Sequence, residues 1–267
     1  VHYSAAERTV RTYDGREVAP VAGRPPHIRG PDGTPRPARI PVMGGQSVGV
    51  PGLLRMLEMT HRAHGTLPWA RLFEPAIALA EAGFPMSPRL HQHVAFETDL
   101  RRSQQARDYF LGPDGTPKPA GERVVNLAYA ETLRAIARGG AEVFYRGDIA
   151  RDIVATVRNA RANPGHMTEA DLVGYRAKER APVCGSYRGY RICSMGPPSS
   201  GGLTVLQILG ILQHFDLGAM GAGSVQALHL FEVAVLPLES GLQGVVVTAS
   251  GLAGGADSRR EGVALGD

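Results

Sequence analysis

The stretch Tyr187–Gly202 constrains the fold of this chain more than any other segment. Two short runs, Val183–Tyr187 and Tyr190–Met195, flank a two-residue turn and predict a β-hairpin. The dipeptide Pro197-Pro198 follows; both rings fix φ and neither residue donates a backbone N–H. A pair of glycines then opens an apolar helix predicted over Leu203–His214. Two rigid prolines, two hydroxyl side chains and two glycines with accessible backbone follow one another within six residues. This combination predicts that the segment forms the wall of a site.

The two hydroxyls of this stretch belong to Ser199 and Ser200, and either could suggest a hydrolase nucleophile. A nucleophile elbow would have the pattern Gly-x-Ser-x-Gly, which is not the pattern here. We therefore predict that these serines cap the helix that starts at about Leu203. An additional role in the wall of a site stays open.

The two cysteines of the chain, Cys184 and Cys193, lie on the two predicted strands of the hairpin. If Arg188-Gly189 forms the turn, they stand opposite each other at a non-hydrogen-bonded position, where Cα atoms lie closest. A disulfide is sterically possible at such a pair. Two free thiols are an equally good interpretation, because the sequence does not reveal the redox compartment.

The rest of the chain alternates helical patterns with turns rich in Gly and Pro. A first hairpin is predicted over residues 1–4 and 9–13, and a long loop over 21–42. Thr168 and Ser224 are predicted to cap helices. The helices are predicted over 53–64, 68–82, 88–105, 126–139, 143–159, from 168 onward, 203–214 and from 225 onward.

Composition limits the classes of function that fit this chain. The length of 267 residues suits one large domain or two small ones, and no apolar run is long enough to cross a bilayer. The net charge is +4, and all basic residues except Lys118 and Lys178 are arginines. The arginines are dispersed and not interleaved with aromatic residues, which argues against a nucleic-acid interface. We interpret the charge as a solvated surface.

No metal or cofactor is predicted. The pairs His61/His64 and His91/His93 lack a third convergent ligand and resemble histidines on helix surfaces. The glycine-rich segment Gly44–Gly52 lacks the Gly-Lys-Ser/Thr ending of a phosphate loop, and it does not match the dinucleotide-binding pattern. We interpret this segment, taken alone, as a tight turn that leads into a helix.

Arg16 is the strongest single candidate for a binding residue. It follows a predicted strand and an Asp-Gly turn. A guanidinium can bind a carboxylate with two parallel hydrogen bonds. The alternative is a surface arginine paired with Asp14 or Glu17, and the residues alone favour that alternative.

Taken together, these segments resemble the gamma-glutamyltransferase family, also called gamma-glutamyltranspeptidase or glutathione hydrolase. The resemblance covers roughly residues 1–232, and its pieces occur in family order. They are Tyr13–Pro20, Ser47–Gly52, His64–Ala80, Gly83-Phe84, Met167–Leu172, Tyr175–Ala177, Tyr187–Tyr190 and Ser194–Gly202.

The resemblance implies an α+β fold, the αββα sandwich of N-terminal-nucleophile hydrolases, which is incomplete in this chain. It implies a precursor that cuts itself into a large and a small subunit, and a Thr nucleophile at the start of the small subunit. That Thr would transfer the γ-glutamyl group of glutathione or another γ-glutamyl compound to water, amino acids or peptides. By the same resemblance, Arg16 binds the α-carboxylate of the glutamyl group. A periplasmic or extracellular location fits the family, but the sequence leaves the compartment open.

The chain also departs from the family pattern. The Thr-Thr-His segment and the later serine and glycine segments are not found, and the match is lost after Glu232. We therefore predict a partial large subunit over residues 1–232 and a divergent, poorly ordered tail over 233–267. A reading-frame change near Val233 is one hypothesis, and it fails if no other frame of the coding DNA restores the family pattern.

These departures predict that the chain alone does not catalyse the family reaction. They also predict marginal stability or aggregation, because an incomplete sandwich leaves sheet edges and apolar faces uncovered. Two alternatives remain: a non-catalytic binding or regulatory fragment, and an acylase-type relative that acts on another amide.

Overall fold

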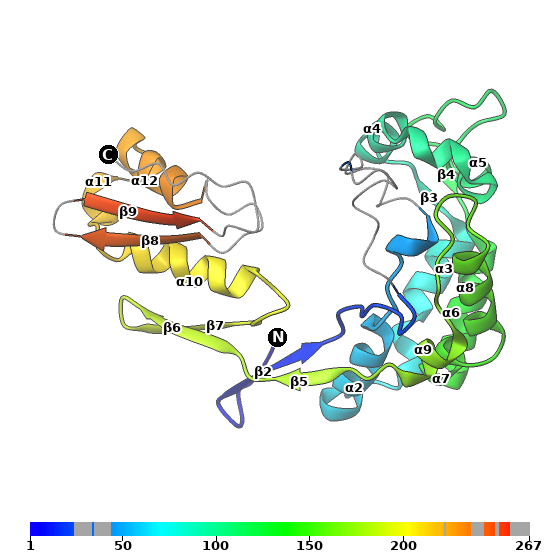
Figure 1. Ribbon diagram of the computed structural model, residues 1–267, viewed down its shortest axis with the longest axis horizontal. Helices are drawn as coiled ribbons and strands as arrows, with labels where there is room; N and C mark the ends of the chain where they lie inside the picture. Colours follow the sequence, from blue (N-terminus) through cyan, green and yellow to red (C-terminus); the bar gives the residue numbers. More distant parts are fainter. Residues whose placement is uncertain (24–33, 35–43, 222, 236–242, 249–250, 257–267) are drawn as a thin grey trace. The chain divides into compact units, whose positions relative to one another are not determined.

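The computed structural model describes residues 1–23, 34, 44–221, 223–235, 243–248 and 251–256 (Figure 1). Its residues group into two compact units. One unit combines Val1–Asp14 with Lys178–Asp267, and the other is formed by Gly15–Ala177. The predicted loop over 21–42 lies mostly outside the described residues.

The unit Gly15–Ala177 is mainly helical. It also contains a small antiparallel ladder, in which β3 (Phe84–Pro85) pairs with β4 (Arg123–Val124). Its helices, in chain order, are η1 (Gly45–Ser47), α2 (Leu53–His64), η2 (Trp69–Leu72), α3 (Glu74–Ala82), α4 (Pro88–Phe96), η3 (Thr98–Arg102), α5 (Gln104–Phe110), α6 (Leu127–Gly139), α7 (Glu142–Tyr145), α8 (Asp148–Arg158) and α9 (Glu169–Gly174).

Two long helices of the sequence prediction are broken in the structure. The predicted helix over 88–105 is three shorter ones, because Glu97 and Ser103 each cap the start of a new helix with their side chains. The predicted helix over 143–159 is divided into α7 and α8 at Gly147, whose φ of 78° lies in the left-handed region. The first break follows from side-chain caps and the second from a glycine in the left-handed region, and both override the continuing apolar pattern.

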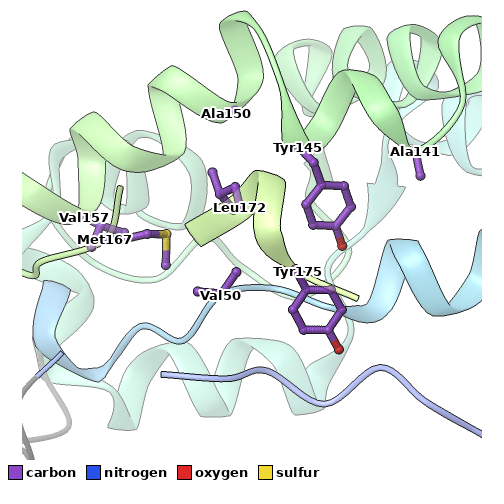
Figure 2. Packing of buried hydrophobic residues seen from close by; sticks show 8 residues of the cluster. All are labelled: Val50, Ala141, Tyr145, Ala150, Val157, Met167, Leu172 and Tyr175. Atoms are coloured by element: carbon purple, nitrogen blue, oxygen red, sulfur yellow. The ribbon is translucent and has the colours of Figure 1, made fainter. Parts of the chain in front are cut away.

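The main core of this unit is a cluster of buried residues contributed by α7, α8, α9 and the segments next to them (Figure 2). Each large apolar side chain in such a cluster stabilises the fold by about 1.5–3 kcal/mol relative to exposure. The core therefore fixes the positions of the loops that touch it. Its members are Val50, Ala141, Tyr145, Ala150, Val157, Met167, Leu172 and Tyr175.

In the other unit, three strands form an antiparallel sheet in the order β1-β2-β5. They are β1 (His2–Ser4), β2 (Thr9–Asp14) and β5 (Lys178–Arg180), and the β1–β2 pair confirms the predicted first hairpin. The predicted second hairpin is also confirmed, with β6 (Val183–Tyr187) antiparallel to β7 (Tyr190–Ser194).

The hairpin β6–β7 leads into α10 (Gly201–Leu212), which packs back on it. A Cβ added at Gly185 of β6 would lie 2.9 Å from Leu206 Cδ2, so a glycine allows the helix to approach the strand. The elements that follow are α11 (Leu217–Met220), α12 (Val225–Val235), β8 (Gln243–Thr248) and β9 (Gly251–Ala256).

The predicted tail over 233–267 thus includes the end of α12 and the hairpin β8–β9, and the rest of it lies outside the described residues. Its divergence from the family and its poor order stay predictions. Among the residues that the structure describes, none of the helices has the length and apolar character that a bilayer crossing requires.

Candidate functional site

Arg16 lies two residues beyond the end of β2, and its side chain is 60% exposed. Its Nε donates a hydrogen bond to Glu17 Oε1 at 2.9 Å. Asp14, the other partner considered for it, forms an ion pair with Arg180, with 2.6 Å between Oδ2 and Nε. The ion pair with Glu17 is as exposed as Arg16 itself, and exposed pairs of this kind contribute only about 0–1 kcal/mol.

The backbone around Arg16 is held much more firmly than its side chain. The Tyr175 hydroxyl donates a hydrogen bond to the Arg16 carbonyl at 2.7 Å. Two residues later, Val18 and Val50 exchange backbone hydrogen bonds of 3.4 and 2.8 Å. The surface guanidinium is therefore carried by an anchored peptide unit.

Gly52, the residue before α2, completes this anchor. A Cβ at Gly52 would overlap the Tyr175 hydroxyl and would lie 2.6 Å from the Gly15 carbonyl oxygen. A Cβ at Gly15 would lie 2.6 Å from Met56 Cβ on α2. The segment predicted to be a tight turn does lead into a helix, as expected. It also lets the start of that helix approach the Arg16 backbone, which the sequence alone did not indicate.

Tyr175 is half of a pair of stacked tyrosines. Its ring lies 6.3 Å from the Tyr145 ring at an angle of 13°, and both hydroxyls point the same way (Figure 2). The Tyr145 hydroxyl donates to the Pro51 carbonyl at 2.9 Å and accepts from the Arg55 N–H at 3.2 Å. Burial raises the pKa of Tyr145 above its ordinary value, which further favours the protonated hydroxyl that donates to Pro51.

A charged cavity of about 380 Å³ lies beside these tyrosines. Arg55 Nη2 and Glu142 Oε2 are 2.6 Å apart, and Arg62 Nη2 and Glu58 Oε1 are 3.1 Å apart. The Arg55 guanidinium also lies 4.3 Å from the centre of the Tyr145 ring. The lining of the cavity contains four arginines and two glutamates and therefore carries a net positive charge, while its ion pairs hold Arg55 over the Tyr145 ring.

The segment Ser194–Gly202 belongs to the other unit. The Pro197–Pro198 bond is cis, and Ser199 N–H closes a turn onto the Gly196 carbonyl at 3.0 Å. The prediction that a serine side chain caps α10 is wrong. Ser200 stands at the N-cap position, but its backbone is helical (φ −80°, ψ −25°) and its side chain makes no capping hydrogen bond. A capping side chain needs a non-helical backbone at its own residue to reach the first N–H groups of the helix.

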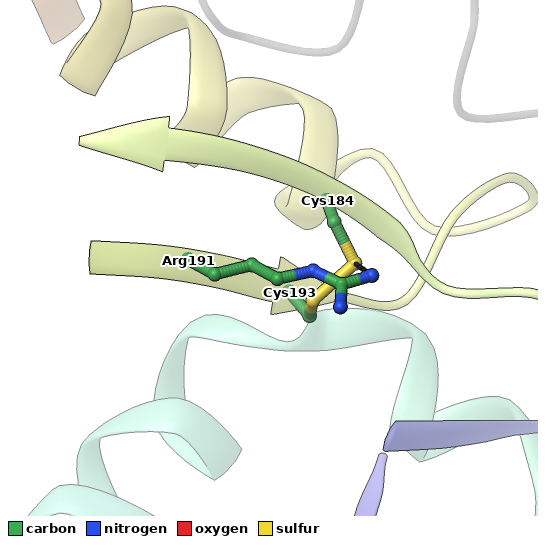
Figure 3. Close-up of a disulfide and its surroundings, with 3 residues drawn as sticks. All are labelled: Cys184, Arg191 and Cys193. Carbon is green, nitrogen blue, oxygen red and sulfur yellow. Dashed lines mark hydrogen bonds between the residues drawn. A yellow bond between two sulfur atoms is a disulfide. The ribbon is translucent and has the colours of Figure 1, made fainter. Parts of the chain in front are cut away.

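Cys184 and Cys193 are bonded to each other across β6 and β7 (Figure 3). They are register partners, as counting from the turn predicted, and their Cα atoms lie 4.2 Å apart. The Arg191 guanidinium reaches the disulfide, with its Nη2 3.8 Å from Cys184 Sγ. Of the two states left open by the sequence, the structure contains the disulfide.

The histidine pairs do not gather into a metal site in the part of the chain that the structure describes, where no group of three His, Cys, Asp or Glu side chains could hold an ion. His61 Nε2 is hydrogen-bonded to the Leu67 carbonyl and His91 Nδ1 to the Lys118 carbonyl, each at 2.8 Å. Both rings thus take part in local structure.

Sequence reasoning missed the role of Tyr175, although Tyr175–Ala177 was one of the family-like pieces. Nothing in its local pattern marks it as different from a core tyrosine. The only available signal was that it lies in one of the segments that resemble the family. Arg16 and Tyr175 lie together, whereas Ser194–Gly202 is part of a different compact unit.

Comparisons with known proteins agree with the resemblance. The family model for gamma-glutamyltranspeptidase matches residues 1–238. Over 195 residues, the chain is 40% identical to the acylase ACY 1 proenzyme of Pseudomonas sp. (strain V22), covering 73% of this chain and 34% of that protein. Over 215 residues, it is 35% identical to the glutathione hydrolase proenzyme of Bacillus subtilis (strain 168), covering 80% and 36%.

A solved structure matches as well. The crystal structure of Helicobacter pylori gamma-glutamyltranspeptidase has a TM-score of 0.77 and 32% identity to this chain, covering 86% of this chain and 65% of that one. This match confirms the predicted α+β fold class of N-terminal-nucleophile hydrolases. The chain spans about a third of the length of the curated relatives it matches. On the family-model match and these relatives, the chain belongs to the gamma-glutamyltranspeptidase family.

Proposed function

We propose that this chain is a large-subunit portion of an enzyme that transfers the γ-glutamyl group of glutathione, or of another γ-glutamyl compound, to water, amino acids or peptides. The family-model match over residues 1–238 and the similarity to glutathione hydrolase proenzymes support this proposal. The chain would act together with a small subunit that supplies the Thr nucleophile.

The reaction itself is an acyl transfer. The Thr hydroxyl attacks the γ-glutamyl carbonyl, its proton passes through the Thr amine to the leaving amine, and an ester forms as the amide bond breaks. Water or an amine then attacks the ester and releases the Thr hydroxyl. All of these steps require the small subunit, so the chain alone should bind the substrate without turning it over.

In this proposal, Arg16 binds the α-carboxylate of the γ-glutamyl group. The observation that carries it is the contrast between an anchored backbone and an exposed guanidinium. A substrate carboxylate could replace the Glu17 carboxylate at little cost, because an exposed ion pair is weak. A bidentate Arg–carboxylate pair is stronger and more selective than the single Nε hydrogen bond to Glu17 that it would replace.

Two measurements test this proposal. Calorimetry of the purified chain with glutathione should show binding that Arg16→Ala weakens by at least about tenfold, the value of one charged hydrogen bond. Incubation of the same chain with a γ-glutamyl anilide should release no aniline. Release of aniline would contradict the assignment of the nucleophile to another chain, and unchanged binding by Arg16→Ala would contradict the role of Arg16.

Acylase activity is a second candidate, favoured by the 40% identity to the acylase ACY 1 proenzyme. The two candidates differ in the acyl group they bind: a γ-glutamyl group carries both an α-carboxylate and an α-amino group, and an acylase substrate need not carry both. Glutaryl amides lack the amino group, and 4-aminobutyryl amides lack the α-carboxylate. Tighter binding of a glutaryl amide than of its γ-glutamyl counterpart would favour the acylase. Binding without turnover even after a small subunit is supplied would favour a non-catalytic fragment.

A further inference from the structure

The carbonyl oxygen of Arg16 accepts a hydrogen bond from a residue that lies far along the chain. The Tyr175 hydroxyl, 159 residues away in sequence, donates to the Arg16 carbonyl at 2.7 Å. The residue before Arg16 is Gly15, which has no side chain to restrict its own backbone. The backbone position of an arginine that follows a glycine must therefore be fixed by a contact from another part of the chain.

Tyr175 is itself rigidly placed. The residue is only 5% exposed, and it belongs to the buried cluster that contains Tyr145 and Leu172. It is the C-cap residue of α9, and its N–H donates to the Leu172 carbonyl at 3.2 Å. The other end of α9 is closed by a capping box between Thr168 and Asp171. The hydroxyl is thus held at a defined point before any ligand binds.

Close packing against Gly52 also restricts the position of the Tyr175 hydroxyl. Because a Cβ there would overlap the Tyr175 hydroxyl, the hydroxyl, the Gly52 backbone and the Gly15–Arg16 segment are packed against one another. Movement of the Arg16 carbonyl would break the hydrogen bond from Tyr175. The Arg16 guanidinium remains at the surface, where it can meet a ligand.

We propose that Tyr175 is a positioning residue for carboxylate recognition: its hydroxyl holds the Arg16 peptide so that the guanidinium is presented in one place. This inference rests on the proposed role of Arg16. A pre-placed guanidinium loses less conformational freedom when it binds a carboxylate. The consequence is tighter binding of ligands that carry an α-carboxylate, and no change for ligands that lack one.

Tyr145 offers a matched control. It lies in the same cluster, its ring stacks on that of Tyr175, and its hydroxyl also donates to a backbone carbonyl, that of Pro51. Tyr145→Phe removes a buried hydroxyl that makes two hydrogen bonds, to the Pro51 carbonyl and from the Arg55 N–H, so it should cost at least as much stability as Tyr175→Phe. It leaves the donor to the Arg16 carbonyl in place. A difference between the two variants isolates positioning from stability.

The ligand test uses the whole chain and two compounds that differ only in the α-carboxylate, L-glutamine and 4-aminobutanamide. Titrations followed by NMR give affinities for the wild type, Tyr175→Phe, Tyr145→Phe and Arg16→Ala. We expect Tyr175→Phe to weaken L-glutamine binding about fivefold, the equivalent of one neutral hydrogen bond. Tyr145→Phe should stay within about twofold, and 4-aminobutanamide should bind equally weakly to all four.

Two further measurements keep the test decisive if a variant is poorly folded. Replacing Tyr175 by para-aminophenylalanine restores a donor at the same place and should restore L-glutamine affinity. Amide hydrogen exchange at Val18, which lies two residues beyond Arg16 and whose N–H donates to the Val50 carbonyl, should quicken in Tyr175→Phe and not in Tyr145→Phe. This exchange is measured without ligand.

The outcomes separate the inference from the function on which it rests. Equal effects of Tyr175→Phe and Tyr145→Phe on L-glutamine binding would overturn the positioning role, and so would unchanged binding and exchange in Tyr175→Phe while Arg16→Ala weakens binding. If the wild type does not prefer L-glutamine over 4-aminobutanamide, or if Arg16→Ala changes nothing, the proposed function of Arg16 fails first. Hydrogen exchange then still decides whether Tyr175 fixes the Arg16 peptide.

Discussion

At the scale of single residues, the candidate site depends on close packing around a glycine. Gly52 has no positive φ that would require a glycine, and its role is to leave space for the Tyr175 hydroxyl and the Gly15 carbonyl. Gly174, at the end of α9, has open space where a Cβ would stand. Two glycines in one unit thus differ in what they contribute.

Gly52→Ala should lower the free energy of unfolding by about 1–3 kcal/mol, because an added methyl group in a packed site forces the surrounding groups to shift. It should also weaken binding of α-carboxylate ligands, since the group displaced is the anchor of Arg16. Urea unfolding and L-glutamine titration measure the two effects. Gly174→Ala is the control, with unchanged binding and stability within about 1 kcal/mol of the wild type. Equal stability of both variants would contradict the packing argument.

At the scale of elements, helix caps show where local sequence rules hold. Thr168 and Ser224 cap α9 and α12 through their side chains, as predicted from residue type. Ser200 has the same residue type before α10 but makes no such bond, because its backbone is already helical. A cap is therefore predictable only when the residue before the helix keeps a non-helical backbone.

The capping box of α9 predicts a pH dependence of stability. Burial raises the pKa of Asp171, but hydrogen bonds from the Val21 N–H and from Thr168 outweigh it and hold that pKa below its ordinary value. A depressed carboxylate pKa stabilises the fold above the unfolded pKa of about 3.9 and loses that effect as pH falls through the folded pKa.

Asp171→Asn should therefore lower the free energy of unfolding by about 1 kcal/mol at neutral pH, the usual value of a lost cap. The difference from the wild type should shrink as pH falls below about 4. Denaturant unfolding across pH 3 to 7 measures it. Asp152→Asn, at an exposed position of α8, should change stability by less than about 0.5 kcal/mol. A difference that persists undiminished in acid would contradict the ionic contribution of Asp171.

At the scale of the whole molecule, the chain groups into two compact units. The unit Gly15–Ala177 contains the buried cluster and the Arg16 anchor. The other contains the disulfide hairpin and α10. A chain that groups into two compact units is expected to unfold in separate steps, so each unit has its own free energy of unfolding. The values predicted above for the Gly52 and Asp171 variants are those of the unit Gly15–Ala177.

We expect calorimetry to show a calorimetric enthalpy larger than the van't Hoff enthalpy. Reduction of the Cys184–Cys193 bond by a dithiol should then lower one transition and leave the other in place. A disulfide that closes a short loop stabilises its unit by about 2–3 kcal/mol in the chain-entropy account. The Cys184→Ser/Cys193→Ser double variant, with and without the dithiol, is the control for effects of the reductant itself. One cooperative transition that shifts as a whole on reduction would show that the units unfold together.

Much of the fold was predictable because its signals are local. The first hairpin, the Cys184–Cys193 register and the helix α2 all follow from residue spacing within a few positions. The helix over 88–105 was predicted too long, because the caps at Glu97 and Ser103 compete with an apolar pattern that continues across them. Arg16 was predicted as a binding candidate from its place in a family-like segment, and its role is still to be tested.

The sequence by itself determined the family, most of the elements and the candidate Arg16, since motif order, periodicity and turn residues can be seen along the chain. Only the tertiary structure decided what holds Arg16. Tyr175 reaches its carbonyl across 159 residues, after α9 and the buried cluster have set the direction of the ring. Such a contact is determined by the packing of distant elements, and packing leaves no regular pattern in the sequence on either side.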